Sequence, residues 1–206
     1  MKPTPHKIYL ASKSPRRREL LRQIGVEFEL MMLRDHPPRG PEVSEIVMPG
    51  ELPADYVTRV AREKADFAWN TLLYRRLPNR PILAADTTVA LGTRIFGKPA
   101  NQAEAIDMLK ALSGRTHQVL TSVAICHDGE MLQITQTSDV AFGVLTEEVI
   151  RAYCATSEPY DKAGGYAIQG LAALFIQDIA GSYSGIMGLP LFETAQLLQQ
   201  AGIHTL

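Results

Sequence analysis

Three arginines follow a Ser-Lys-Ser-Pro turn in the segment LASKSPRRREL, residues 10–20. Ser14 and Pro15 stand where the N-cap and the first residue of a helix are expected, so the arginines fall in the first helical turn. The free backbone N–H groups of such a turn can bind an anion, and the hydroxyl of Ser12 adds a donor. A solvated basic turn is the alternative interpretation. However, positive side chains at the start of a helix interact unfavourably with the helix dipole. Their presence at this position therefore favours a site that binds an anion.

The guanidinium groups of these arginines carry forked donors that match the oxygens of a phosphate. Successive residues of a helix point about 100° apart. We therefore expect at most two of Arg16, Arg17 and Arg18 to face one ligand.

A lone aspartate follows an apolar run in the segment ILAADTT, residues 82–88. The carboxylate of Asp86 lies at the end of an expected buried strand, where it could bind a divalent cation or activate a water. The alternative is an aspartate that caps a turn. Aspartyl-phosphate phosphatases also place an aspartate after an apolar strand, but they carry a second acid two residues later. Thr88 stands at that position, which argues against that class.

Two lysines and a glutamate could complete such a site. Lys64 lies on the apolar side of its expected helix, and Lys98 lies in a Gly-Lys-Pro turn. An ammonium group is a point charge suited to phosphate, although either lysine could instead extend to solvent. Glu45 lies in a long loop, where it could share a metal ion with Asp86 or simply be solvated.

Gln169 lies in the glycine-rich segment SEPYDKAGGYAIQG, residues 157–170. Its side-chain amide offers an acceptor beside a donor, which matches the N3–H and O4 groups of uracil and thymine. Because an amide can flip, this residue by itself discriminates poorly against cytosine. A glutamine before a glycine turn is also a common surface pair.

The elements that must position these residues alternate between strand and helix. Strands are expected at residues 6–12, 27–31, 80–91, 93–99 and 173–182, and as a hairpin within 117–142 around a His-Asp-Gly-Glu turn. Helices are expected at residues 14–24, 52–69, 101–112, 146–156 and 189–202. Residues 34–51 form a long loop rich in proline and glycine. This alternation predicts an α/β fold with a mixed sheet.

The composition is typical of a folded protein with little net charge. Hydrophobic residues make up 46% and charged residues 21% of the 206 residues, which is enough to bury a sizeable core. The net charge of −1 argues against nucleic-acid binding. No apolar run reaches the roughly 18 residues of a membrane span, and residues 1–12 lack the apolar core of a signal peptide. We therefore expect a cytoplasmic protein, in which Cys126 and Cys154 are reduced thiols.

Seven segments of the chain, taken in order, closely resemble the Maf-like nucleoside triphosphate pyrophosphatases. They are LASKSPRRRELL, YVTRVAREKA, AADTTV, GKP, MLKALSGRTHQVLTSVAI, EPYDKAGGYAIQG and GSYSGIMGLPL. The resemblance implies one domain over residues 1–206, with an elongated central mixed sheet flanked by helices and a nucleotide cleft between two lobes. It also implies metal-dependent cleavage between the α- and β-phosphates of a nucleotide, with Mg²⁺ or Mn²⁺ as the cofactor.

The resemblance further implies roles for individual residues. The family's phosphate-binding Ser-x-x-x-Arg elements fall on Ser12, Arg16 and Arg17. Its two lysines fall on Lys64 and Lys98, which would neutralise charge on the bridging oxygen and the leaving pyrophosphate.

The catalytic aspartate of the family falls on Asp86. Its acidic loop residue, which would share the metal with that aspartate, falls best on Glu45. Glu42 is the alternative, because the loop before Glu45 looks several residues longer than is usual in the family.

Three positions separate a dTTP- and UTP-preferring subgroup from one that prefers 7-methyl-GTP. The first subgroup has arginine after Ser-Pro, threonine after the catalytic aspartate and glutamine before the last glycine of IQG. Arg16, Thr87 and Gln169 match all three, so the resemblance implies a dTTP/UTP pyrophosphatase.

Other functions stay open at this point. Fold-related enzymes that destroy deaminated purine triphosphates would leave Gln169 without a role. A nucleotide-binding regulator of cell division or septum formation, without turnover, has no need of acids such as Asp86 beside phosphates. The resemblance also suggests a homodimer, which nothing in the surface pattern shows.

Overall fold

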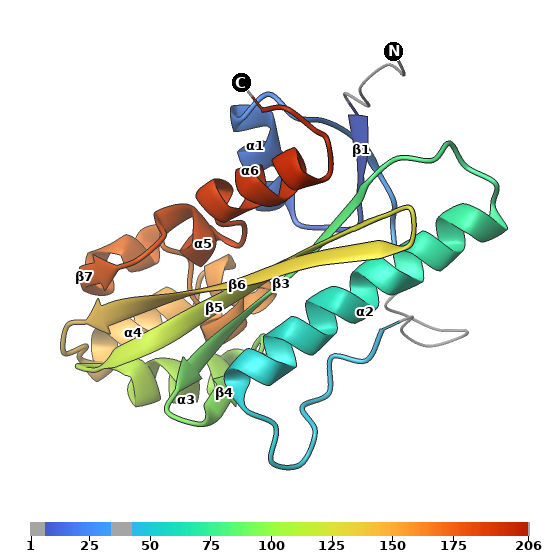
Figure 1. Cartoon of the computed structure of the whole chain (residues 1–206). Coiled ribbons are helices and arrows are strands. Elements are labelled where there is room, and N and C mark those ends of the chain that lie inside the picture. The colour runs from blue at the N-terminus through green and yellow to red at the C-terminus, as the bar shows by residue number, and fades with distance from the viewer. Residues whose placement is uncertain (1–6, 34–42, 206) are drawn as a thin grey trace.

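The computed structural model describes residues 7–33 and 43–205, which build one mixed β-sheet with helices on both faces (Figure 1). The described strands are β1 (Lys7–Leu10), β2 (Glu27–Leu30), β3 (Ile82–Leu91), β4 (Arg94–Phe96), β5 (Thr116–His127), β6 (Glu130–Phe142) and β7 (Ile176–Ala180). The described α-helices are α1 (Pro15–Gln23), α2 (Pro53–Tyr74), α3 (Gln102–Leu112), α4 (Glu147–Cys154), α5 (Tyr183–Met187) and α6 (Leu191–Gln200). Three short 3₁₀ turns are η1 (Glu158–Asp161), η2 (Ala163–Gly165) and η3 (Leu171–Phe175).

The strand order is β2–β1–β3–β5–β6–β7, with β4 attached to β3. β1 is parallel to both β2 and β3, whereas the remaining pairs are antiparallel. β5 and β6 form a long hairpin whose turn has positive φ angles at Asp128 (52°) and Gly129 (83°). Two such residues are typical of a type I′ turn, which suits the twist of the flanking strands. The expected α/β class, mixed sheet and hairpin are confirmed.

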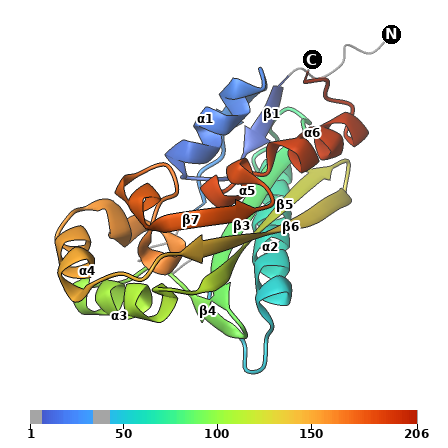
Figure 2. The same cartoon turned by 90° about the vertical axis from the view of Figure 1, so that its left-hand side faces the viewer.

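Side chains of β3 alternate between the two faces of the sheet, as they must in a strand. Ala84 packs on one face with the alanine stripe of α2. Leu83 and Ala85 pack on the other face with leucines of α1 and α6. Figures 1 and 2 show α2 on one side of the sheet and α5 and α6 on the opposite side. The central strand is therefore covered on both faces, which explains its unbroken apolar run.

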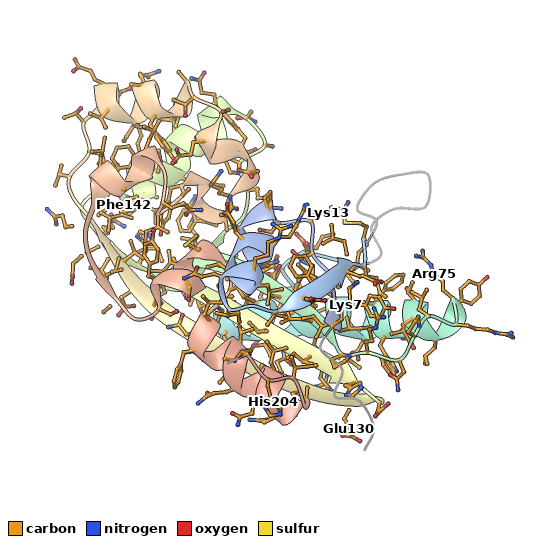
Figure 3. The ribbon with its side chains drawn as sticks, turned by 90° about the horizontal axis from the view of Figure 1, so that it is seen from above. Lys7, Lys13, Arg75, Glu130, Phe142 and His204 are labelled. Carbon is orange, nitrogen blue, oxygen red and sulfur yellow. The ribbon has the colours of Figure 1, made fainter. Side chains whose placement is uncertain are left out.

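A third hydrophobic cluster fills the end of the sheet where α3, α4 and η3 pack. Phe142 is fully buried in it, and Figure 3 shows this residue among the side chains at one end of the molecule, far from Glu130 at the other end of β6. Its ring meets His117 and Tyr166 edge to face at centroid distances of 4.8 and 4.9 Å. This geometry is favourable for aromatic pairs.

The structure differs from the expected elements most clearly in three places. α2 continues from residue 69 to Tyr74, because Leu72 is still buried against the sheet. The strand expected over 173–182 is β7 at 176–180, preceded by the turn η3. Helix α5 was not expected, since five residues are too few to show a helical period.

Two further observations concern the cysteines and the helices. Cys126 and Cys154 are buried free thiols, as expected. Among the described residues, none of the helices combines the length and the apolar character needed to span a membrane.

Candidate active site

A cleft of about 690 Å³ opens above β3, between the start of α1 and the turns η1 and η2. Nine of the residues singled out in the sequence line it: Ser12, Arg16, Arg17, Glu45, Lys64, Asp86, Thr87, Lys98 and Gln169. Glu42, the alternative acidic residue, lies outside the described part of the chain. The structure thus brings residues from six separate segments to one concave surface, which is the usual setting of a ligand site.

Asp86 lies on the floor of the cleft and is 8% exposed. Strand alternation turns its side chain toward α2, where the Nζ atom of Lys64 lies 2.8 Å from Oδ1 of Asp86. The same Nζ atom lies 2.6 Å from Oε1 of Glu45. One ammonium group therefore bridges the two carboxylates.

The loop that carries Glu45 is fastened to α2. The hydroxyl of Tyr56 donates to the backbone carbonyl of Glu45 at 3.1 Å. Arg59 donates to the carbonyls on either side, those of Ser44 at 3.3 Å and Ile46 at 3.1 Å. These contacts hold the glutamate over the cleft, and motif-based reasoning missed both Tyr56 and Arg59.

The cations of the cleft control the charge of Glu45. Burial raises its pKa, but the positive charges of Lys64, Lys98 and Arg17 outweigh burial, so the pKa lies below its ordinary value. Glu45 is therefore ionised at neutral pH. An ionised carboxylate beside Asp86 is what a divalent cation requires of the protein.

The start of α1 follows the expected cap. Oγ of Ser14 accepts from the backbone N–H of Arg17 at 3.5 Å, and Oγ of Ser12 accepts from the N–H of Ser14 at 3.2 Å. Arg16 and Arg17 line the cleft, whereas Arg18 turns away and donates to the carbonyl of Lys13 at 2.6 Å. The helical rotation thus separates the three arginines.

Comparison with known proteins places this arrangement in a family. The family model described as "Maf-like protein" matches residues 7–201. The chain belongs to the Maf-like protein family. The resemblance drawn from the seven sequence segments is thereby confirmed.

Several curated relatives match this Maf-like chain over nearly its full length. One from Aromatoleum aromaticum is 53% identical and covers 98% of both chains. One from Ralstonia nicotianae is 54% identical over 98% of this chain and 96% of its own. One from Dechloromonas aromatica is 48% identical over 97% of this chain and 100% of its own. All three are named dTTP/UTP pyrophosphatase.

Among solved structures, the Staphylococcus aureus Ham1 protein matches with a TM-score of 0.44 and 16% identity, over 66% of this chain and 71% of its own. That likeness is too weak to carry an argument.

The wall opposite α1 in this Maf-like chain carries Gln169, which is exposed at the rim. Glu158, at the start of η1, connects this turn to η3. Its carboxylate accepts hydrogen bonds from the backbone N–H groups of Leu171 at 2.8 Å and Ala172 at 3.2 Å. A side chain on Gly170 would overlap that carboxylate. A larger residue at the last glycine of the IQG motif would therefore displace the Glu158 carboxylate from these hydrogen bonds.

His117, which is not among the residues predicted for the site, packs beneath the same wall. It is 1% exposed, and its Nε2 atom lies 2.7 Å from the hydroxyl of Tyr166, a cleft residue. Burial lowers the pKa of His117 to about 4, so the ring is neutral at pH 7. Its role in the structure is packing beneath the cleft, and its spacing in the sequence gave no signal of this.

The acidic residues of the cleft have the character of ligands for a divalent cation. No group of three or more His, Cys, Asp or Glu side chains within residues 7–33 and 43–205 could hold a metal by itself. Mg²⁺ in nucleotide sites is usually held by one or two carboxylates together with substrate phosphates. The pair Asp86 and Glu45 fits that pattern.

Proposed function

We propose that this chain hydrolyses dTTP and UTP to the nucleoside monophosphate and pyrophosphate, with a divalent cation as cofactor. The observation that carries the proposal is the pairing of Asp86, on the cleft floor, with Glu45, on the loop above it, in a cleft lined by arginines and lysines. The name dTTP/UTP pyrophosphatase, borne by relatives that are 53% and 54% identical over 98% of this chain, supports the same activity.

The charge of the cleft suits a triphosphate, which carries about four negative charges and needs cations around it. Arg16 and Arg17 would hold the phosphates from the α1 side, together with the hydroxyl of Ser12. Lys64 and Lys98 would neutralise charge on the bridging oxygen and on the leaving pyrophosphate. A pure nucleotide binder would gain nothing from the buried carboxylate of Asp86, which repels phosphates.

In the proposed reaction, the oxygen of a water forms a bond to the α-phosphorus. The bond between that phosphorus and the oxygen bridging to the β-phosphorus breaks, and pyrophosphate leaves with the electron pair. Asp86 positions the water and accepts its proton. The contact of Lys64 with Oδ1 holds the carboxylate in one orientation, which is the kind of preorganisation that lowers a barrier.

Asp86 and Glu45 would hold the cation, which we propose to be Mg²⁺ or Mn²⁺. When bound, such an ion neutralises phosphate charge and helps to orient the substrate. The ammonium of Lys64 already lies between the two carboxylates, so the protein keeps them close together.

Selection of the base is proposed to lie at the rim, where the amide of Gln169 would pair with the N3–H and O4 groups of uracil or thymine. Arg16 and Thr87 would contribute to the same preference. Arg16 lies 3.8 Å from the carboxylate of Asp161, so it reaches across the cleft toward the wall that carries the glutamine. We also propose that the chain acts as a single domain in the cytoplasm, without nucleic-acid or membrane partners, and forms a homodimer.

Pyrophosphate release from dTTP, UTP, CTP, 7-methyl-GTP and ITP, with Mg²⁺, Mn²⁺ or EDTA, tests the proposal. Metal-dependent release led by dTTP and UTP is the expected result. Release led by another base would overturn the specificity assignment. Nucleotide binding without release would favour a regulator over an enzyme.

A further inference from the structure

Helix α5 and its flanks, the motif GSYSGIMG at residues 181–188, have no role in the site as described so far. Two main-chain carbonyls of this segment accept hydrogen bonds, one from a side chain of α1 and one from a side chain of β5. The carbonyl of Gly188 accepts from Nε of Arg17 at 2.7 Å. The carbonyl of Gly185 accepts from the hydroxyl of Thr121 at 2.8 Å. The segment therefore contacts the phosphate side of the cleft at two points.

Thr121 connects the second point to the same arginine. It lies directly opposite Thr87 in the pairing of β3 with β5, and the two hydroxyl oxygens are 2.9 Å apart. The Thr87 oxygen in turn lies 3.1 Å from Nη2 of Arg17. Arg17, Thr87, Thr121 and the Gly185 carbonyl thus form one continuous chain of hydrogen bonds.

The direction of this chain follows from counting hydrogens. A threonine hydroxyl has one hydrogen, and that of Thr121 is given to the Gly185 carbonyl. Thr121 must therefore accept the hydrogen of Thr87. The Thr87 oxygen then has lone pairs to accept from the guanidinium of Arg17. Every hydroxyl hydrogen in the chain is used, and the guanidinium donates at its head.

Burial makes this arrangement rigid. Thr121 is 0% exposed, and a hydrogen bond in the interior is stronger than one in water. Arg17 also donates to Oγ of Ser12 at 3.3 Å, so three of its five N–H groups bond to protein oxygens while it still lines the cleft. The hydrogen of Thr87 is committed to Thr121, so Thr87 influences a substrate through Arg17 and does not donate to it.

We propose that Thr121 is a positioning residue that acts through Thr87 to aim the guanidinium of Arg17 at the phosphates of the nucleotide, with α5 as the fixed end of the chain. The inference rests on the proposed function for the identity of the ligand. It extends the site to a buried residue on β5 and gives the GSYSGIMG motif a part in phosphate binding.

The test compares Thr121→Val, which keeps the shape but removes the hydroxyl, with Thr121→Ser, which keeps the hydroxyl. Binding of inorganic pyrophosphate with Mg²⁺ is measured by calorimetry, and KM and kcat are measured with dTTP. We expect the valine variant to bind pyrophosphate about three- to tenfold more weakly, as the loss of one neutral hydrogen bond predicts. KM should rise by a similar factor with little change in kcat, and the serine variant should resemble the parent.

A double-mutant cycle with Arg17→Ala separates positioning from a merely structural role. If Thr121 acts through Arg17, the valine substitution causes no further loss of pyrophosphate binding once the arginine is absent. An equal fold-loss in both backgrounds would overturn the proposal. If the valine variant does not fold, Thr121→Cys, whose thiol is a weak donor and acceptor, serves in the same cycle.

The outcomes distinguish this inference from the proposed function. A parent protein that binds pyrophosphate and shows the coupling, but releases none from dTTP or UTP, would reject the enzyme and keep the positioning role. A parent protein that binds no pyrophosphate would overturn the positioning role itself.

Discussion

Lowering the pH should destabilise the protein through the buried imidazole of His117. The ring packs edge to face against Phe142 and against Tyr166, to whose hydroxyl it also bonds. Burial lowers the pKa of His117 from 6.5 to about 4, although the backbone of Arg115 and the charge of Asp139 partly oppose this. The folded protein therefore keeps the ring neutral at pH values where the unfolded chain protonates it.

The sign and size of the effect follow from this difference in pKa. Between about pH 6.5 and pH 4 the unfolded state binds one more proton than the folded state, so stability is present above pH 6.5 and is lost as the pH falls. The gap between 6.5 and about 4 corresponds to about 3 kcal/mol over the whole range, of which about 2 kcal/mol is lost by pH 5.

Urea unfolding followed by circular dichroism at pH 8 and pH 5 measures this loss. His117→Gln is the matched control, because its amide is neutral at both pH values and can still bond to the hydroxyl of Tyr166. Carboxylates titrate in both proteins. The difference between the stability lost by the parent and that lost by the variant therefore gives the contribution of the histidine. We expect the parent to lose about 2 kcal/mol more than the variant. Equal losses would refute the assignment of a neutral, buried His117.

Four further results are expected. Asp86→Asn should lower kcat for dTTP at least about a hundredfold while the protein stays folded, and near-normal turnover would remove this residue from the mechanism. Gln169→Glu should reduce kcat/KM for UTP, because it places a carboxylate against O4, and an unchanged UTP/GTP preference would contradict the base assignment. EDTA should abolish pyrophosphate release and added Mg²⁺ or Mn²⁺ should restore it, whereas activity that survives chelation would argue against the cation. Gly170→Ala should destabilise the fold by about 1–3 kcal/mol in a thermal melt, because its Cβ would overlap Glu158, while Gly97→Ala, which has open space, should not.

Local signals in the sequence predicted most of the elements. Ser14, Asn101 and Thr146 each cap the helix that was expected to follow them, because their side-chain oxygens accept a backbone N–H in the first turn. The apolar run before Asp86 predicted a strand covered on both faces. These signals act over a few residues, so they can be read without knowing the fold.

Contacts between distant segments could not be predicted in this way. The motifs named Lys64 and Glu45 separately, but only the fold shows that one ammonium contacts both Glu45 and Asp86. Thr121 belongs to the segment MLKALSGRTHQVLTSVAI, but nothing in that segment singles it out, because its importance comes from lying opposite Thr87 in an antiparallel pair. Helix α5 escaped prediction because its five residues are too few to show a helical period, and only the fold shows that it lies against β5.

The position of Asp86 and Thr87 along β3 determines where the molecule can deform. The residues just before them, Leu83 and Ala85, belong to one hydrophobic cluster, and Val89, just after them, belongs to another. β5 likewise contributes Val123 to the first cluster and Val119 to the second. Because the same strands run through both clusters, we expect the floor of the cleft to be stiff.

With a stiff floor, the cleft adapts to a ligand at its rim, where residues 43–51 and 157–170 include no long helix or strand. Little of a ligand's binding free energy is then consumed in reshaping the residues that contact its phosphates. Substitutions at the rim should therefore be tolerated more readily than substitutions on the floor of the cleft.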